Sequence, residues 1–348
     1  MNLSPDITRD TSCASDYEFE ERRSYSSRVN VYFNNGVIGL TFFMTHLATK
    51  KMLQNNIFSK TTRSLLFCCM LYYVLHDIYF AGVMNWSLLR SVVYSDDRCH
   101  VMFVGSECFF LYIVGVFARI LLLTSQVAVT AERLIVTIFP NSDLINTATV
   151  NMMTIILSVI GTSMIKPPGP SEFNSPNCFQ QMFVGMKTFK SLLIFMLLFV
   201  AFCFPVNCIV MIKHRIVFFH RFKTNIGYTL NSRFADKQKM YASTIVSVIS
   251  FFQTLIYSVY IAALYFILKY YTTDEGMFYG SNLILWFYTF PFAGLALPTS
   301  IVLSYSILTY KRKNKVGVMK VNNYTSQDAY FKNLKSQWNQ DGSRLSIT

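Results

Sequence analysis

The sequence predicts an all-α protein in which seven helices cross a membrane as one bundle. Of its 348 residues, 53% are hydrophobic and only 14% are charged, whereas about a quarter of the residues in a soluble domain are charged. The charged residues lie in clusters between long uncharged runs. Seven of these runs reach roughly the ~20 residues that a helix needs to cross a ~30 Å hydrocarbon core. A buried core helix accounts for one such run but not for seven.

The composition also excludes two other classes of protein. The net charge of +13 does not indicate a partner such as nucleic acid, because the basic residues are clustered between uncharged runs. The 21 tyrosines and 32 phenylalanines exclude a disordered chain. We therefore expect a membrane protein that binds no nucleic acid.

Each span is recognised by its lack of charge, and together the spans make up a bundle over residues 29–310. Five runs contain no Asp, Glu, Lys or Arg and cover about residues 29–49, 144–165, 191–212, 241–268 and 280–310. The run 64–89 is interrupted only by Asp77, and the run 108–131 only by Arg119.

An odd number of spans places the two termini on opposite sides of the membrane, and cytoplasmic loops carry an excess of Lys and Arg. The segment 50–63 has four basic residues and no acid, and the segment 213–240 has seven basic residues and one acid. These segments are therefore predicted to be cytoplasmic, with the tail 1–28 outside and the tail 311–348 inside. The tail 1–28 has no signal-peptide pattern, so we expect the first span to start insertion. The basic run 311–315 suits anionic lipid headgroups.

The eight cysteines divide by predicted location, and four of them lie within spans, where cysteine packs as a small hydrophobic residue. Cys13, Cys99, Cys108 and Cys178 fall on the outer side, in an oxidising compartment, and four cysteines allow three pairings. Cys108 opens the third span and Cys178 lies in the loop after the fourth, so we expect a disulfide that ties this loop over the helix end. Cys13 and Cys99 then form the second disulfide; the alternative is free thiols.

Three Asn-X-Ser/Thr triplets are candidates for N-glycosylation. Those at Asn2 and Asn85 fall outside under this topology and are predicted sites. Asn85 is the weaker of the two because it lies close to the membrane. The triplet at Asn323 falls inside and is expected to be unused.

Charged residues inside a bilayer face the bundle interior or a partner. In the third span Tyr112, Arg119, Gln126 and Arg133 recur every seven residues and share one helix face. Arg119 lies about 21 Å from Arg133 along the helix, near the middle of the bilayer, and Asp77 lies at a comparable depth. One interpretation is an Arg119–Asp77 ion pair. The other interpretation is that Arg119 binds an anionic or carbonyl-bearing ligand. Both interpretations hold if the ligand competes with Asp77 for the guanidinium of Arg119.

Aromatic side chains with polar tips are concentrated in the outer halves of the late spans, at Tyr257, Tyr260, Trp286 and Tyr288. Such groups line ligand pockets, but they also pack between helices or face lipid. Together with Tyr112 and Arg119 of the third span, they make up the predicted ligand site.

Glu132 and Arg133 close the third span at the predicted cytoplasmic surface. One interpretation is an interfacial pair that anchors the helix end. The other is a latch that breaks on activation and frees Arg133 for a cytoplasmic partner. An adjacent Glu-Arg pair is common in proteins, but the position of this one, 25 residues after Cys108, makes it more specific.

Several short segments share their order and spacing with a known family: Thr11-Ser12-Cys13-Ala14-Ser15, Ser95-Asp96-Asp97-Arg98-Cys99 with Ser106-Glu107-Cys108, Thr130-Ala131-Glu132-Arg133-Leu134, and Leu230-Asn231-Ser232-Arg233-Phe234. His76 in the second span, with Pro291 and Pro298 in the seventh, fits the same pattern. Together they resemble the serpentine receptor class alpha (Sra) chemoreceptors of nematodes. The related Srab, Srb and Sre classes are the nearest alternatives.

This resemblance implies a G-protein-coupled receptor in the plasma membrane of a sensory neuron, specifically its cilium. It implies an odorant or tastant bound in the outer half of the bundle, a heterotrimeric G protein at the end that holds Glu132 and Arg133, and no cofactor. Leu134 stands where rhodopsin-like receptors have tyrosine, and Leu297-Pro298 where they have Asn-Pro. The activation mechanism of rhodopsin-like receptors therefore cannot be assigned as a whole to this chain.

Two other classes compete with a receptor. A ligand-gated channel or a transporter of the plasma membrane is the alternative function. A transporter often has internal repeats and paired interrupted helices, and the sequence has neither. A channel is expected to have a stripe of polar or charged residues along its pore, whereas these spans hold only one arginine and one aspartate. An enzyme is not expected, because no metal-ligand cluster, carboxylate pair or serine–histidine arrangement is present.

Overall fold

The computed structural model describes residues 13, 16–54, 58–103, 105–139, 147–164, 178, 186–224, 230–270 and 285–310. These residues are mainly helical and contain no strand, which confirms the all-α prediction. The chain divides into two compact units, Met1–Ile301 and Val302–Thr348. All contacts reported below lie within the first unit.

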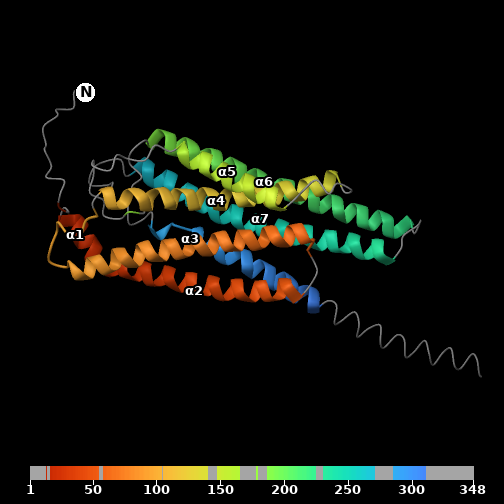
Figure 1. Cartoon of the computed structure of the whole chain (residues 1–348), viewed down its shortest axis with the longest axis horizontal. Coiled ribbons are helices and arrows are strands. Elements are labelled where there is room, and N and C mark those ends of the chain that lie inside the picture. The colour runs from red at the N-terminus through yellow and green to blue at the C-terminus, as the bar shows by residue number, and fades with distance from the viewer. Residues whose placement is uncertain are drawn as a thin grey trace, which may run out of the picture. The chain divides into compact units, whose positions relative to one another are not determined.

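The helices follow one another in chain order (Figure 1): α1 (Asp16–Arg23), α2 (Tyr25–Gln54), α3 (Lys60–Val93), α4 (Gly105–Ile138), α5 (Thr147–Ser163), α6 (Met186–Thr224) and α7 (Leu230–Tyr270). A further helix, Phe290–Tyr310, continues past the unit boundary at Ile301. The seven predicted spans fall on α2 to α7 and on this last helix. Parts of the predicted spans, residues 144–146, 165 and 280–284, lie outside the described residues, as do the tail 311–348 and residues 1–12.

Five of the described helices are long and apolar enough to cross a membrane, judged by length and composition: Lys60–Val93, Glu107–Ile138, Leu198–His220, Asp236–Ile267 and Phe290–Tyr310. α5 is apolar, but its 17 residues are few. α2 has 30 residues, enough to cross a membrane, but it is less apolar than the five helices named above. Its polar residues include Asn34, which is buried and donates from Nδ2 to the main-chain oxygen of Asn30 at 2.9 Å. The side-chain amide of Asn34 is therefore hydrogen-bonded inside the bundle, as polar groups within a membrane must be.

α4 is the central helix, because it contacts four other predicted spans, on α3, α5, α6 and α7, whereas α3 contacts three, on α2, α4 and α5. α3 shows the pattern expected beside it: Tyr73, His76 and Phe80 are buried, while Leu71 and Leu75 on other faces are exposed. Spacings of three and four residues place side chains on one side of a helix. The face of α3 that holds Tyr73 and His76 therefore lies inside the bundle, and Leu71 and Leu75 face outward, where a bilayer would lie.

Candidate functional site

The face of α4 that was predicted to point inward is buried. Tyr112, Arg119, Gln126 and Arg133 are each between 5% and 7% exposed. Nε of Arg119 donates to the main-chain oxygen of Gly115, one turn earlier, at 3.2 Å. The seven-residue repeat therefore marks a buried polar stripe along the central helix, as predicted.

Four tyrosines interact with the guanidinium of Arg119, and with it they form what we call the Arg119 cluster: Tyr79, Tyr112, Tyr260 and Tyr288. Cζ of Arg119 lies 5.8 Å from the centre of the Tyr288 ring, within the range of a cation–π contact. Tyr260 packs edge-on against Tyr288, with ring centroids 5.7 Å apart. The cluster thus joins α3, α4, α7 and the segment before the last helix.

The hydroxyl of Tyr260 is the open polar position of the Arg119 cluster. Tyr260 is 2% exposed, and its hydroxyl oxygen lies beside the guanidinium of Arg119, which can only donate to it. The hydroxyl proton of Tyr260 has no acceptor among the described residues. An unsatisfied buried polar group costs about 1–3 kcal/mol, so it marks a place where a further polar atom is favourable. A guanidinium can only donate. Arg119 and Tyr260 together therefore favour a hydrogen-bond acceptor at this position.

Gly115 makes room for the tyrosine that α3 contributes to the cluster. The hydroxyl of Tyr79 donates a hydrogen bond to the main-chain oxygen of Leu111 on α4. A Cβ atom at residue 115 would lie 2.7 Å from that hydroxyl oxygen, which is closer than real Cβ contacts allow. Glycine at this position is therefore what lets Tyr79 approach α4 beside Arg119.

The Gly115→Ala variant is expected to lose about 1–3 kcal/mol of stability. Alanine favours a helix by about 1 kcal/mol over glycine, but overpacking costs about 1–3 kcal/mol. The displaced Tyr79 also loses its hydrogen bond to Leu111, worth about 1 kcal/mol. The measurement is the midpoint of thermal unfolding of the purified protein in detergent.

Gly82→Ala on α3 is the matched control for this variant. No atom lies within 4 Å of a Cβ atom at residue 82, so only the helix preference of alanine acts and the midpoint should stay or rise. A Gly115→Ala protein that unfolds no earlier than the wild type would contradict the close contact with Tyr79.

Asp77 and Arg119 do not form the predicted direct ion pair. Among the described residues, the ion-pair partner of Asp77 is His76, with Oδ1 and Nδ1 3.1 Å apart. Nε2 of His76 lies 2.6 Å from the hydroxyl of Tyr288, whose ring faces Arg119. Histidine and tyrosine thus connect the two charges indirectly. The prediction was wrong because it compared only the depths of the two residues and took no account of side chains from other segments.

Two of the six predicted ligand residues, Tyr257 and Trp286, are not among the side chains that interact with the guanidinium of Arg119. Tyr257 shares a hydrogen bond with the hydroxyl of Tyr73, to which Nε2 of Gln253 also donates, at 2.9 Å. These three side chains form a separate polar layer between α3 and α7. Trp286 is 39% exposed, and its indole N–H donates to Oγ of Ser26 on α2 at 3.3 Å. The structure thus brings three of the predicted residues, Tyr112, Tyr260 and Tyr288, to Arg119, whereas Trp286 contacts α2.

Glu132 and Arg133 form a buried pair that also contacts α3. Nε of Arg133 donates to Oε2 of Glu132 at 2.7 Å, and Nη2 donates to Oε1 at 3.1 Å. Oε1 also accepts a hydrogen bond from Thr62 Oγ1 at 3.0 Å. Thr62 lies in the first turn of α3, which is capped by Oγ of Ser59 accepting from the Thr62 main-chain N–H. The pair therefore connects α4 to the beginning of α3.

The opposite end of the bundle, which we call the disulfide end, holds both predicted disulfides. They join Cys108 to Cys178 and Cys13 to Cys99. Next to Cys99, the Asp97 carboxylate accepts hydrogen bonds from the ring and the main-chain N–H of His100. These bonds lower the pKa of Asp97 below its usual value.

Asn85 does not suit its predicted role as a glycosylation site. It lies within α3, and its Nδ2 donates to the main-chain oxygen of Ala81 at 2.8 Å and to Oδ1 of Asn35 at 3.1 Å. Nδ2 of Asn35 donates back to Oδ1 of Asn85 at 2.9 Å. The amide that would carry a glycan is therefore engaged between two helices. Asn2, the other predicted site, lies outside the described residues.

Sequence reasoning missed three residues of these sites. Tyr79 and Thr62 received no role, and His76 was singled out only for a family resemblance. One signal was present: His76 and Tyr79 stand three residues apart within an otherwise apolar span and so share a helix side with each other. No comparable signal pointed to Thr62, because threonine is common at the start of a helix.

Comparison with known proteins assigns the family. The family model for the serpentine type 7TM GPCR chemoreceptor Sra matches residues 8–338. Serpentine receptor class alpha-32 of Caenorhabditis elegans is 24% identical over 93% of this chain and 95% of its own length. Serpentine receptor class alpha-10 of Caenorhabditis briggsae is 25% identical over 94% of this chain and 97% of its own length. The chain therefore belongs to the Sra family of seven-transmembrane chemoreceptors.

Proposed function

We propose that this chain is a chemosensory G-protein-coupled receptor that binds a small odorant or tastant at the Arg119 cluster. The family consists of chemoreceptors rather than enzymes. The observation that carries the proposal is a buried guanidinium among four tyrosines, one of which has a hydroxyl proton without an acceptor among the described residues. Its place of action is the plasma membrane of sensory neurons, at the cilium.

The disulfide end faces outside in this proposal. Disulfides form in oxidising compartments, and both bridges lie at that end. The excess of basic residues in 50–63 and 213–240 favours the same orientation. The N-terminal tail is then extracellular, and the end that holds Glu132 and Arg133 is cytoplasmic.

The ligand carries a hydrogen-bond acceptor, and a carboxylate fits best. Arg119 offers several N–H donors and Tyr260 one O–H donor, whereas an amine would meet like charge. A charged acceptor strengthens such bonds about twofold over a neutral one. The aromatic rings around Arg119 favour an apolar remainder of the ligand.

Signalling follows from a shift between conformations of the bundle. At the cytoplasmic end Glu132 holds Arg133 and Thr62 together. Release of this contact frees Arg133 and separates α4 from the beginning of α3. We propose that a heterotrimeric G protein binds the end of the bundle in that released state.

The test is a reporter assay for calcium or cAMP in cells that express the protein. The panel consists of straight-chain carboxylic acids of increasing length, each with its methyl ester and its alcohol. The acids are expected to act at the lowest concentrations. Arg119→Ala should weaken them by about 10–100-fold, since a hydrogen bond to a charged group contributes about 1.5–3 kcal/mol. Arg119→Lys, which keeps the charge, should weaken them less.

Trp286→Ala is the matched control, because the structure places this aromatic residue away from Arg119. It should leave the acid response unchanged, and surface expression is measured for every variant. If the acids act on Arg119→Ala at the same concentrations as on the wild type, Arg119 is not the ligand anchor. An acid-evoked current that survives blockade of G proteins would instead support the ligand-gated channel.

A further inference from the structure

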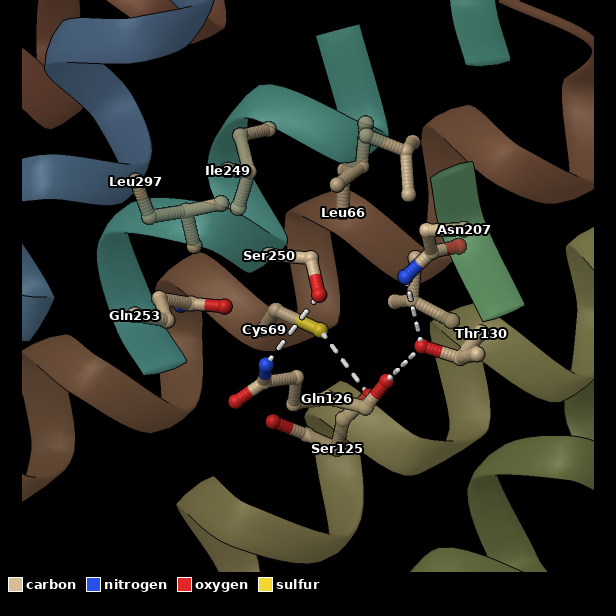
Figure 2. Close-up of a pocket in the computed structure, with 12 residues that line it drawn as sticks. Leu66, Cys69, Ser125, Gln126, Thr130, Asn207, Ile249, Ser250, Gln253 and Leu297 are labelled. Atoms are coloured by element: carbon tan, nitrogen blue, oxygen red, sulfur yellow. Dashed lines mark hydrogen bonds between the residues drawn. The ribbon is translucent and has the colours of Figure 1, made fainter. Parts of the chain in front are cut away.

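A small cavity inside the bundle is lined by both apolar and polar side chains (Figure 2). Its α4 residues, from Ser125 to Thr130, lie between Arg119 and the Glu132–Arg133 pair along that helix. α3, α4, α6, α7 and the Phe290–Tyr310 helix all contribute to its lining. The polar side chains that line it include Cys69, Gln126, Thr130, Asn207, Ser250 and Gln253. The cavity volume of ≈ 20 Å³ exceeds the ~10–15 Å³ that one water molecule needs. It is too small for an organic ligand.

Gln126 brings an unsatisfied atom to this cavity. The residue is 5% exposed, and its Oε1 has no hydrogen-bond partner among the described residues. Its Nε2 donates to Oγ of Ser250 on α7 over 3.4 Å, near the upper limit for a hydrogen bond. A buried carbonyl oxygen without a partner costs about 1–3 kcal/mol, so a donor at this place is favourable.

The neighbouring side chains leave donors for such a partner. Oγ of Ser250 accepts from Gln126, and its own hydroxyl proton has no acceptor in the described part of the chain. The side-chain amide of Gln253 has two N–H groups, one of which goes to the hydroxyl of Tyr73. A water molecule that accepts from either residue can donate to Oε1 of Gln126.

Two groups of hydrogen-bonded side chains reach the cavity. On one side the hydroxyl of Tyr73 is hydrogen-bonded to both Tyr257 and Gln253. On the other side Nδ2 of Asn207 donates to Oγ1 of Thr130 at 2.9 Å, and Oγ1 of Thr130 donates to the main-chain oxygen of Gln126 at 3.0 Å. From the second side, Nε2 of Gln126 reaches Ser250 on α7 through the weak bond, and among the described residues no hydrogen bond continues from Ser250 to the first side.

We propose that this cavity is a binding site for one water molecule, which donates to Oε1 of Gln126 and accepts the hydroxyl proton of Ser250. Such a water completes the connection between α4 and α7 with two ordinary hydrogen bonds. The site does not depend on the proposed function, since it rests on side chains inside the bundle alone.

The test is radiolytic hydroxyl-radical labelling of the purified full-length protein in detergent, read by mass spectrometry. Radicals form from water, so a buried side chain is oxidised when a bound water lies beside it. Cys69 lines the cavity and is 6% exposed, and its sulfur is readily oxidised. Met70 is the matched control, because its sulfur is also buried, at 2% exposed, and it does not line the cavity.

The expected result is faster oxidation of Cys69 than of Met70 in the wild type, relative to an unirradiated sample. Gln126→Leu should reduce the labelling of Cys69 to the level of Met70, because the water loses its acceptor. Equal labelling of Cys69 and Met70 in the wild type would overturn the proposal, and this comparison needs no variant to fold. Labelling of Cys69 that persists in a folded Gln126→Leu protein would also overturn it.

Discussion

The Glu132→Ala variant is expected to lose about 3–5 kcal/mol of folding free energy, because removing one partner of a buried ion pair leaves the other charge uncompensated. Glu132 is 1% exposed and Arg133 is 5% exposed. The carboxylate accepts two hydrogen bonds from the guanidinium, and both are lost. Thr62 also loses its acceptor, so the beginning of α3 is released from α4. The alanine side chain carries no negative charge that could replace these contacts with Arg133.

The measurement is thermal unfolding of the purified protein, followed with a dye that fluoresces on reaction with thiols. Cys69 and Cys203 are buried and not in disulfides, so they react as the bundle opens. Thr62→Val removes one neutral-to-charged hydrogen bond and keeps the ion pair, and it should cost no more than about 1.5–3 kcal/mol. The midpoint for Thr62→Val should therefore lie between those of the wild type and Glu132→Ala.

A double variant separates the loss of the pair from the loss of packing. In Glu132→Leu/Arg133→Leu both charges are absent, and apolar residues of similar volume often replace a buried pair without loss of stability. Its midpoint should recover most of the difference from the wild type. A double variant less stable than Glu132→Ala would show that the uncompensated charge of Arg133 is not the cause.

The helices and the inward face of α4 could be predicted because both depend on local sequence. Hydropathy depends on consecutive residues, and the repeat that contains Arg119 and Gln126 has a fixed relation to the turns of a helix. The span on α2 was found through its lack of charge, although buried asparagines such as Asn34 make it less apolar than the others. The predicted side of the membrane selected the four cysteines of the disulfides, and the positions of Cys108 and Cys178 at the ends of their spans suggested the pairing.

The partners of the polar side chains could not be predicted in the same way. Asp77 and Arg119 lie at similar depths on neighbouring helices, but Tyr288, 212 residues after His76, provides the contact between them. Which side chain turns toward which depends on the rotation of each helix about its axis, and depth carries no such information. Trp286 shows the same limit, since its neighbours Tyr288 and Phe290 are buried while it reaches Ser26 on α2.

Replacement of both cysteines in Cys108→Ala/Cys178→Ala is the second variant for which a large effect is expected. The bridge closes a loop of 70 residues, and the chain-entropy relation gives about 4 kcal/mol for a loop of that length. The same loop contains the spans α4 and α5, which stay helical in a membrane and limit the freedom of the unfolded chain. We therefore expect the free energy of unfolding to fall by about 2–4 kcal/mol, which is the typical range for a disulfide.

Cys13→Ala/Cys99→Ala is the matched control, since this bridge closes a loop of similar length, 86 residues. Loop entropy alone predicts a slightly larger effect for the control. Burial predicts the reverse: Cys108 and Cys178 are 0% exposed, so their removal also leaves a void in the core, whereas Cys99 lies at the exposed surface. The Cys108/Cys178 variant should therefore have the lower unfolding midpoint and the smaller fraction of protein at the cell surface. A lower midpoint for the Cys13/Cys99 variant would mean that loop closure, and not the packing around Cys108, dominates the stability of the disulfide end.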